Sequence, residues 1–171
     1  MTYSQPARLE RHHNLADFEC RSEEQTIWLR KYARQADSMG TTTVFVVTPD
    51  DSASSVAAYY AWCMAAVSPA DAPERLAKGA GQYAQPVALL ARLGVDLGHE
   101  RRGLGWGMLQ DVFGRLAGLR EEIGCRGLLV HCENEEAMGF YLHLVPEFEQ
   151  SPTDPLHLYL LMKDVRRTLG Q

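Results

Sequence analysis

The sequence lacks the features of a membrane-spanning or exported protein. None of its apolar runs is long enough to cross a bilayer, and the opening MTYSQPARLERHH contains no apolar core of the kind found in secretory signals. It also lacks internal repeats, low-complexity tracts and composition shifts that would mark a linker. We therefore expect a cytoplasmic protein with no membrane partner, folded as a single domain over residues 1–171.

Cysteine is scarce, and its spacing excludes two further classes of protein. The four cysteines are Cys20, Cys63, Cys125 and Cys132, and no two of them form a C-x-x-C pair. A disulfide framework or a zinc site would need closer or more regular spacing. No other spacing of metal ligands occurs either. We expect reduced thiols and no metal.

Positive charge is also in short supply, which argues against wholesale coating of nucleic acid. The 17 Lys and Arg residues are outnumbered by 22 Asp and Glu residues, for a net charge of −5. Two local clusters remain: WLRKYAR supplies Arg30, Lys31 and Arg34, and ERRG supplies Arg101 and Arg102. Each cluster is either a solvated surface or a binding patch, and both interpretations stay open at this point.

The first half of the chain predicts a helix, a hairpin and a long loop. A helix is expected over residues 21–35, with Ser22 as N-cap and Gln25 completing a capping box. Residues 41–67 contain two apolar β runs joined by a polar turn, which predicts a hairpin covered by helices. Residues 68–86 predict a long loop with one short helix. The inward-facing residues of the first helix should be Leu29, Ala33 and Ala36.

The second half predicts alternating strands and helices, so the whole chain indicates a mixed α/β fold. Strands are expected over residues 87–97, 125–133 and 156–164, and a short helix over 134–144 with Asn134 as N-cap. Between the first two strands lies a glycine-rich loop and a helix that ends before Gly124. The apolar residues of this helix recur at helical spacing: Met108, Val112, Leu116, Leu119 and Ile123.

The glycine-rich loop, RRGLGWG, has the properties of an anion-binding turn. Glycines at 103, 105 and 107 let backbone amides approach a ligand closely, and the helix that follows places its positive dipole end there. Arg101 and Arg102 add charge. Phosphate or pyrophosphate is the natural ligand, although a plain strand-to-helix turn would look similar. The positions required by a Rossmann or a Walker loop are not met.

The segment LARLGVDLGHERRGLGWGMLQDV resembles motif A of the GNAT acetyltransferases, and MGFYLHL resembles their next signature, an aromatic pair on a helix. With DFECRSEEQTIWLRKYARQADSMGTTTVFVV, EEIGCRGLLVHCENEEAMGFY and SPTDPLHLYLLMKDV, the chain from about Asp17 to Val165 resembles the GNAT toxins of type II toxin–antitoxin modules. The resemblance implies a GNAT fold: a mixed central β-sheet flanked by helices on both faces, with a splayed strand pair around acetyl-CoA. It also implies acetylation of the α-amino group of aminoacyl-tRNA, a ribbon-helix-helix antitoxin and a homodimer.

Site residues follow from the resemblance. The main chain at Gly94 and Val95 would pair with the pantetheine arm, and Asn134 and Phe140 would also contact CoA. Tyr141 is the expected catalytic residue, because a phenol can protonate or hydrogen-bond the departing thiolate. The pyrophosphate contacts would come from Arg101, Arg102, Gly103, Leu104, Gly105 and Trp106. The tRNA contacts would come from Arg30, Lys31, Arg34 and Arg92, which would read phosphates.

No histidine is expected to act as the general base. An α-amino group titrates near 7.7–8.0, so much of it is already nucleophilic at neutral pH. His131 lies in an apolar strand and is expected to be a core residue, and His143 would point away from Tyr141 on the same helix. Trp28 is also expected in the core rather than stacked on a base.

Two places depart from the family pattern. Glu100 occupies the first position of the pyrophosphate loop, where the family has Gln or Arg, so we expect it to face solvent or to be neutralised by Arg101. Residues 144–150 replace a glycine-phenylalanine turn. Two alternative functions therefore stay open: an N-acetyltransferase for a small amine or a protein amine, and an acyl-CoA-binding module without turnover.

Overall fold

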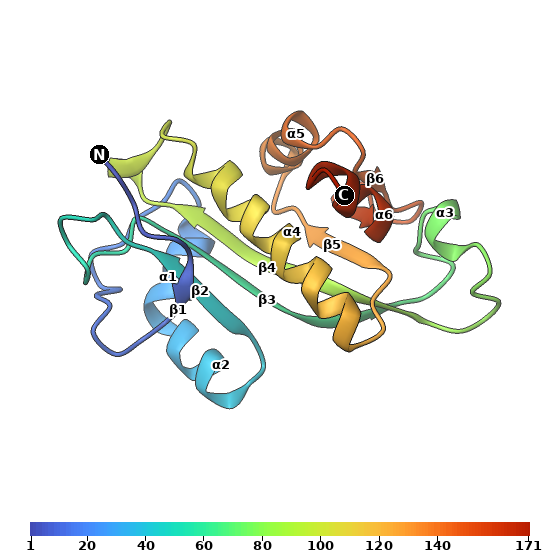
Figure 1. Cartoon of the computed structure of the whole chain (residues 1–171), viewed down its shortest axis with the longest axis horizontal. Helices are drawn as coiled ribbons and strands as arrows, with labels where there is room; N and C mark the ends of the chain where they lie inside the picture. The colour runs from blue at the N-terminus through green and yellow to red at the C-terminus, as the bar shows by residue number, and fades with distance from the viewer. The chain divides into compact units, whose positions relative to one another are not determined.

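The computed structural model describes all 171 residues (Figure 1). Its strands form one mixed sheet in the order β1-β2-β3-β4-β5-β7-β6. The pairings are antiparallel for β1 with β2, β2 with β3, and β7 with β5 and β6, whereas β4 and β5 are parallel. The predicted mixed α/β class is confirmed. The strands are β1 Ala7–Arg8, β2 Thr43–Val47, β3 Ala58–Val67, β4 Gln85–Val95, β5 Gly127–His131, β6 Glu149–Gln150 and β7 His157–Leu161.

Helices occupy the segments between the strands. Most were expected, but the short 3-10 turn η1 and the C-terminal helix α6 were not. None of the helices combines the length and apolarity needed to cross a bilayer. The helices are α1 Glu23–Lys31, α2 Ala33–Met39, α3 Glu74–Ala77, η1 Leu97–His99, α4 Leu104–Glu122, α5 Glu135–Leu144 and α6 Met162–Thr168.

The chain divides into two compact units, each built from two segments. The first unit comprises Met1–Cys63 and Ala91–Asp111, and the second comprises Met64–Leu90 and Val112–Gln171. Strands β3 and β4 and helix α4 each run from one unit into the other. Each unit has a hydrophobic core of its own. The expected single domain over residues 1–171 stays a prediction.

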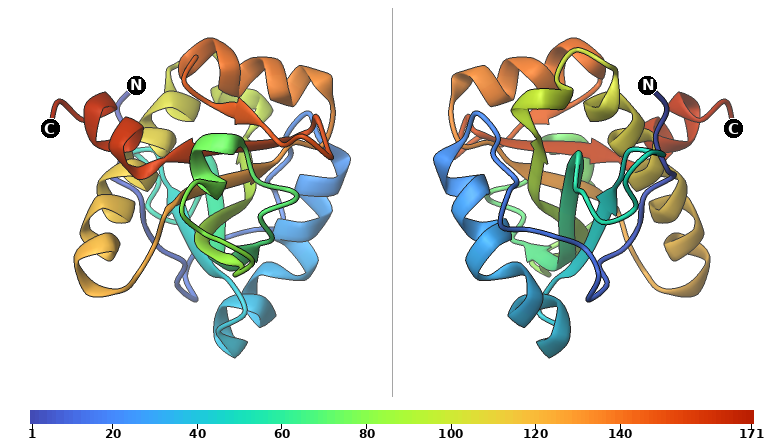
Figure 2. Two further views of the ribbon diagram at one scale, coloured as in Figure 1. Left: turned by 90° about the vertical axis from the view of Figure 1, so that its right-hand side faces the viewer. Right: turned by 90° about the vertical axis from the view of Figure 1, so that its left-hand side faces the viewer.

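In the first unit, the predicted helix over 21–35 is two helices rather than one (Figure 2). Its start was predicted correctly, because the Ser22 hydroxyl accepts a hydrogen bond from the Gln25 amide at 3.1 Å. The break occurs at Tyr32, whose backbone leaves helical geometry at φ −120° and ψ −21°. Ala33 is fully buried as expected, whereas Ala36 is only partly buried.

The hairpin predicted for residues 41–67 is confirmed as β2 and β3, paired from Thr43 opposite Trp62 to Val47 opposite Ala58. Alternate residues of β2 and β3 face the helices, as the period of two in a strand requires. Trp28 packs against this core and lies nearly parallel to the Tyr59 ring, with centroids 6.1 Å apart. The core contains Leu9, Leu15, Phe18, Cys20, Leu29, Ala33, Val44, Val46, Val56, Tyr59 and Ala61.

In the second unit, all five residues of β5 pair antiparallel with β7, from Gly127 opposite Leu161 to His131 opposite His157. The long loop after β3 contains α3 as predicted, and its Leu76 is buried in the core of the unit. The other members of that core are Val67, Ala72, Val87, Leu129, Tyr159 and Leu161.

Two sequence predictions in the second unit are wrong at element boundaries. The strand expected over 156–164 ends at Leu161, and α6 begins immediately at Met162. Met162 and Val165 are buried in the helix, so the apolar pattern continues across the boundary and does not mark it. Ile123 is 52% exposed rather than inward-facing, because α4 ends one residue before it.

We expect buried His13 to make the stability of the protein depend on pH. It is 7% exposed, and its Nδ1 accepts a hydrogen bond from the Glu10 amide at 2.9 Å. Burial, followed by the nearby His12, lowers the pKa of His13 below its ordinary 6.5. The unfolded chain therefore binds this proton more readily than the native protein, and the free energy of unfolding falls as pH drops below about 6.5.

We expect His13→Gln to flatten this dependence, since glutamine can still accept from the Glu10 amide and does not titrate. Denaturant unfolding at pH 7.5, 6.5 and 5.5 would measure how the free energy of unfolding changes with pH. A single titrating group changes that free energy by at most about 1.4 kcal/mol per pH unit. His131 also has a lowered pKa and accounts for part of any remaining slope. An unchanged slope in His13→Gln would exclude His13 as a source.

Candidate active site and cofactor loop

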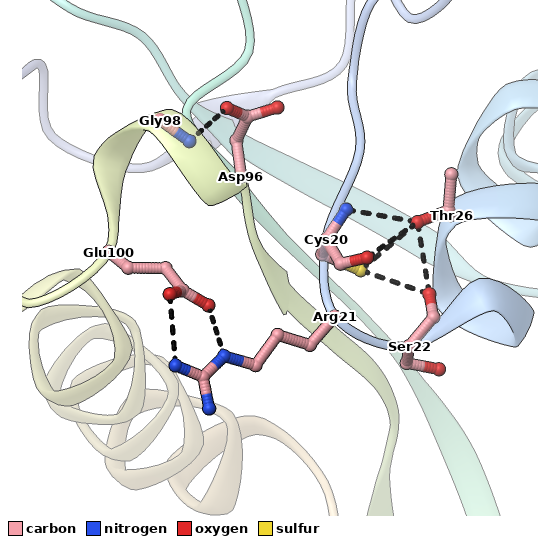
Figure 3. A network of polar contacts seen from close by, with 7 residues as sticks. All are labelled: Cys20, Arg21, Ser22, Thr26, Asp96, Gly98 and Glu100. Carbon is pink, nitrogen blue, oxygen red and sulfur yellow. Dashed lines mark hydrogen bonds and ion pairs between the residues drawn. The ribbon is translucent and has the colours of Figure 1, made fainter.

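The chain leaves β4 through a turn that is fastened to the segment before α1. The Asp96 carboxylate accepts a hydrogen bond from the Gly98 amide within η1 at 2.9 Å (Figure 3). It accepts a second one from the Glu19 amide, also at 2.9 Å. The Leu97 amide in turn donates to the Glu19 carbonyl at 2.8 Å. Three hydrogen bonds thus fix the backbone just ahead of the glycine-rich loop.

Glu100 forms a two-point ion pair with Arg21, which corrects both alternatives expected for it. Arg21 Nε lies 2.7 Å from one carboxylate oxygen, and a terminal nitrogen lies 3.1 Å from the other (Figure 3). Glu100 therefore neither faces solvent alone nor depends on Arg101. The two partners are 79 residues apart, so no local pattern in the sequence could indicate the pair.

The ion pair leaves the loop itself positively charged. Arg101 and Arg102 are exposed, and neither forms an ion pair with a carboxylate. Arg101 also has a left-handed backbone, with φ 60°, a conformation that costs a non-glycine residue of order 1–3 kcal/mol and that clusters at ligand-binding loops.

Gly103 and the start of α4 present backbone amides in the way an anion site requires. Gly103 has φ 79°, which favours glycine, and its carbonyl accepts from the Gly107 amide at 3.0 Å. The amides of Leu104, Gly105 and Trp106 come before the first hydrogen bond of the helix ladder. In a helix of 19 residues, they stand at the positive end of the dipole.

Gly94 is required by packing on its own side of β4. A Cβ at this position would lie 3.0 Å from Tyr59 Cε1 and 3.2 Å from Cys20 Sγ. The glycine therefore lets the strand approach the aromatic core of the first unit. Val95, the second residue expected to meet the pantetheine arm, is partly exposed at the end of the same strand.

Three of the four cations expected to contact tRNA already have partners within the first unit. Arg30 donates to the Phe18 carbonyl at 2.7 Å, and Arg34 donates to the carbonyls of Glu10, at 3.1 Å, and His13. These two arginines hold the segment that precedes α1. Arg92 pairs with Glu24 at 2.8 Å and lies over the Trp28 ring at 5.4 Å. Lys31 is exposed on α1.

In the second unit, α5 positions Tyr141. Asn134 caps the helix as predicted, because its side-chain oxygen accepts from the Ala137 amide at 2.9 Å. The Tyr141 ring is buried and packs edge-on against Phe140, with ring centroids 5.1 Å apart, and against Phe148, at 6.0 Å. The ring is therefore held from two sides.

Burial raises the pKa of the Tyr141 phenol, and the nearby Cys132 adds a smaller effect in the same direction. Tyr141 thus keeps its proton at neutral pH and can act as a donor rather than as a base. Burial also raises the pKa of Cys132 to about 11, so this neighbour is a neutral thiol and not a nucleophile.

Phe148 packs against Tyr141, a contact that the sequence did not indicate. It is 4% exposed, and its amide donates to the Val145 carbonyl at 3.2 Å in the turn that replaces the family's glycine-phenylalanine pair. Val145 itself caps α5 by donating to the Tyr141 carbonyl at 2.9 Å. Because Phe148 lies beyond the end of the helix, helical spacing from Tyr141 could not indicate the contact.

Neither histidine near Tyr141 in sequence is a core residue. His131 is exposed and stacks on His157 with ring centroids 4.0 Å apart, so its expected core position is wrong. It is the last residue of β5 and the one exposed residue of that strand. His143 is exposed on α5. None of the four cysteines forms a disulfide, and no group of three or more His, Cys, Asp or Glu side chains is arranged to hold a metal ion.

Comparison with known proteins identifies close relatives. No family model matches the chain. A tRNA-acetylating toxin of Mycobacterium tuberculosis is 39% identical over 168 residues, covering 98% of this chain and 98% of that protein. The structure of AtaT complexed with acetyl-methionyl-tRNAfMet matches with a TM-score of 0.86 at 19% identity, covering 98% of this chain and 99% of that one. A phenylalanine-for-tyrosine mutant of AtaT, bound to the C-terminus of the antitoxin AtaR and acetyl-CoA, matches with a TM-score of 0.82 at 17% identity over 100% of both chains.

The two structural matches confirm the fold that the resemblance implied, because both cover nearly the whole of each chain. The sequence match is independent of them and is well above the level at which only a fold is shared. On the strength of that 39% identity over almost the full length, the chain belongs to the tRNA-acetylating toxins.

Proposed function

We propose that this chain transfers the acetyl group of acetyl-CoA to the α-amino group of aminoacyl-tRNA and thereby inhibits translation. The observation that carries the proposal is the 39% identity to a tRNA-acetylating toxin over 168 residues. The glycine-rich loop and the protonated phenol of Tyr141 support it, because acetyl transfer from a CoA thioester needs a pyrophosphate site and a proton donor.

In this proposal, the glycine-rich loop binds the CoA pyrophosphate. The amides of Leu104, Gly105 and Trp106 donate to its oxygens, and Arg101 and Arg102 supply positive charge. The left-handed backbone of Gly103 allows the turn that orients these amides toward the pyrophosphate.

The remaining CoA contacts are assigned to β4 and α5. The main chain at Gly94 and Val95 pairs with the pantetheine arm as an added strand would. Phe140 contributes apolar contact. Asn134 uses its side-chain oxygen as the helix cap, which leaves its amide nitrogen as the donor to CoA.

Tyr141 is assigned the role of proton donor. The reaction forms a bond between the amine nitrogen and the acetyl carbon and breaks the bond between that carbon and sulfur. The nitrogen loses one proton to solvent, and the sulfur departs as a thiolate that the Tyr141 phenol protonates or stabilises by a hydrogen bond. A phenol that has given up its proton regains one from solvent. Neither His131 nor His143 is assigned as a base, because about a tenth to a sixth of an α-amino group with a pKa of 7.7–8.0 is already neutral at pH 7.

The assembly is proposed on the same basis. The related toxin AtaT is described in complex with its antitoxin AtaR. We assign this chain a ribbon-helix-helix antitoxin, a homodimeric state, a single catalytic domain over residues 1–171 and a cytoplasmic location. Arg30, Lys31, Arg34 and Arg92 are assigned to tRNA phosphates, with Lys31 the cation most free to move toward them.

The test is transfer of labelled acetyl from acetyl-CoA to total tRNA, either charged or deacylated. Label is expected on charged tRNA alone and should be released together with the aminoacyl ester by mild alkali. Label on a small amine or on protein, with none on charged tRNA, would instead support the alternative N-acetyltransferase. Binding of acetyl-CoA without any transfer would support the non-catalytic module.

The Arg21–Glu100 pair yields a specific prediction for cofactor affinity. In Arg21→Ala, the Glu100 carboxylate is left unneutralised one residue from Arg101, and it opposes the negative pyrophosphate. We expect the KM for acetyl-CoA to rise by about 5- to 10-fold with little change in kcat, and the increase to shrink at high salt.

The double variant Arg21→Ala/Glu100→Gln separates charge from geometry. If Arg21 acts by neutralising Glu100, the double variant should recover most of the affinity for acetyl-CoA. If the double variant binds acetyl-CoA as weakly as Arg21→Ala does, Arg21 acts by holding the loop in place. Calorimetric titration with CoA measures the same effect without turnover.

A further inference from the structure

A hollow in the second unit concentrates positive charge, and its lining includes no residue assigned to CoA or to the reaction. It encloses about 400 Å³ and lies where the end of α4, the start of β5 and α6 meet. We call it the cationic pocket. Its lining consists of Arg120, Cys125, Arg126, Met162, Lys163, Arg166 and Gln171, with no Asp or Glu side chain among them.

The backbone of the pocket is fixed by the joint between β5 and α6. The Met162 amide donates to the Arg126 carbonyl at 3.0 Å, and Arg126 donates through its guanidinium to Gln85 Oε1 at 2.5 Å. Gln85 is neutral, so Arg126 is held in place while keeping its full charge. Buried Cys125 and Met162 form the floor. The pocket is thus a built feature rather than a chance gathering of mobile side chains.

The other three cations are available to a ligand. Arg120 and Lys163 are exposed, and neither forms an ion pair. Arg166 pairs with Glu121 at 3.1 Å, but Glu121 is 74% exposed, so this pair lies in water and is readily exchanged. Four of the chain's 17 cationic residues therefore converge on one hollow in a protein of net charge −5.

Phosphate groups match this lining better than an acidic peptide does. Guanidinium groups bind phosphate oxygens two at a time, and protein–nucleic acid interfaces are polar and strongly cationic. A peptide partner is usually anchored by aromatic or large apolar side chains in well-packed pockets. The floor of the cationic pocket offers only the edges of two sulfur-containing side chains, which are 3% and 8% exposed.

We propose that the cationic pocket binds the phosphate backbone of the tRNA substrate. The inference rests on the proposed function and extends it, since Arg30, Lys31, Arg34 and Arg92 all lie outside this pocket. Phosphate contacts carry no sequence information, so the pocket contributes affinity for the tRNA body rather than choice among aminoacyl groups. It should act on tRNA binding and leave the chemical step unchanged.

The variant that tests this is Arg120→Gln/Lys163→Gln, and Lys78→Gln is the matched control. Lys78 is also an exposed cation of the second unit without an ion pair, but it does not line the pocket. The first measurement is the Kd for deacylated tRNA over a range of salt concentrations. We expect the double variant to bind at least about tenfold more weakly, with the slope of log K against log salt reduced by about 2.

The second measurement separates binding from chemistry. With charged tRNA, the KM of the double variant should rise by a similar factor while kcat stays the same. With a short aminoacylated oligonucleotide, which lacks the tRNA body, the double variant and the wild type should be equal. Thermal unfolding of all three proteins shows whether the substitutions leave the fold intact.

Three results would overturn the proposal. One is an unchanged tRNA affinity and salt slope in the double variant. Another is an equal loss in Lys78→Gln, which would show a general charge effect. The third is weakened binding of the antitoxin with tRNA binding intact, which would assign the pocket to a protein partner. Failure of the proposed function is distinguishable, because the wild type would then not acetylate charged tRNA while the binding measurement would still report on the pocket.

Discussion

Replacing Tyr141 with phenylalanine should lower kcat for acetyl transfer by about 100- to 10,000-fold, the range that a positioned proton donor contributes. The affinity for acetyl-CoA should change little. The phenol is buried and protonated, and it is the only group assigned to the departing sulfur. Without it, the thiolate must leave unassisted in a buried environment, where its charge is poorly solvated.

Phenylalanine is a well-matched substitution at this position. The edge-on contacts with Phe140 and Phe148 involve only the ring, so the variant should keep the packing and the thermal stability of the wild type. His143→Gln is the control, since it removes an exposed titratable group from the same helix and should leave kcat unchanged. Full activity in Tyr141→Phe, or an equal loss in His143→Gln, would contradict the assignment.

The pH profile adds an independent readout of the same role. Activity should rise between about pH 7 and 8 as the α-amino group loses its proton. Since burial raises the pKa of Tyr141 above its ordinary value of 10, no descending limb should appear below pH 10. A descending limb near pH 8 or 9 would point to a donor other than Tyr141. The rising limb should persist in Tyr141→Phe, because it belongs to the substrate.

Local patterns predicted the parts of this fold that local interactions determine. Ser22 and Asn134 were identified as N-caps because the bond from a cap to the amide three residues later is encoded within four residues. The hairpin was predicted from two apolar runs joined by a polar turn, and the glycine-rich loop from three closely spaced glycines, so both also depended on short segments of sequence. The Tyr32 break between α1 and α2 was not, since both halves continue the same helical pattern of apolar residues.

Contacts between distant segments account for most of what the sequence could not reveal. Arg21 and Glu100 are 79 residues apart. Both expectations for Glu100, exposure to solvent or neutralisation by Arg101, considered only the glycine-rich loop and its immediate neighbours. The Phe148 ring packs against the Tyr141 ring across a turn, and no sequence motif predicts the shape of that turn. The cationic pocket likewise draws its charges from α4, the residue just before β5, and α6, so a net charge of −5 concealed it. The resemblance proposed Tyr141 as the proton donor, whereas the contacts around its ring could be described only from the structure.

Gly127→Ala should destabilise the protein severely, by about 3 to 5 kcal/mol, or should prevent folding altogether. A Cβ at Gly127 would overlap the Leu160 carbonyl oxygen and would lie 3.1 Å from the Leu160 carbonyl carbon and 3.2 Å from Leu161 Cα. All of these are backbone atoms, so no side chain can rotate away. Relief requires that β5 and β7 separate at this point.

The neighbouring hydrogen bonds make that separation costly. Gly127 pairs with Leu161, and the Met162 amide is bonded to the Arg126 carbonyl at 3.0 Å. Moving the strands apart therefore breaks the joint between β5 and α6 and exposes Leu128 and Leu160, which are both almost fully buried. Denaturant unfolding monitored by circular dichroism would measure the loss, and tRNA binding at the cationic pocket should fall with it.

Gly118→Ala is the matched control for this experiment. Gly118 is exposed within α4, and a Cβ there meets nothing within 4 Å. Alanine should stabilise the helix by about 0.5–1 kcal/mol, because glycine loses more backbone entropy on folding. Opposite signs for the two substitutions would show that the cost at Gly127 comes from the close approach of the Leu160 backbone and not from glycine replacement in general. A Gly127→Ala protein as stable as the wild type would mean that β5 and β7 can move apart at this point, and it would remove the rigid joint on which the cationic pocket depends.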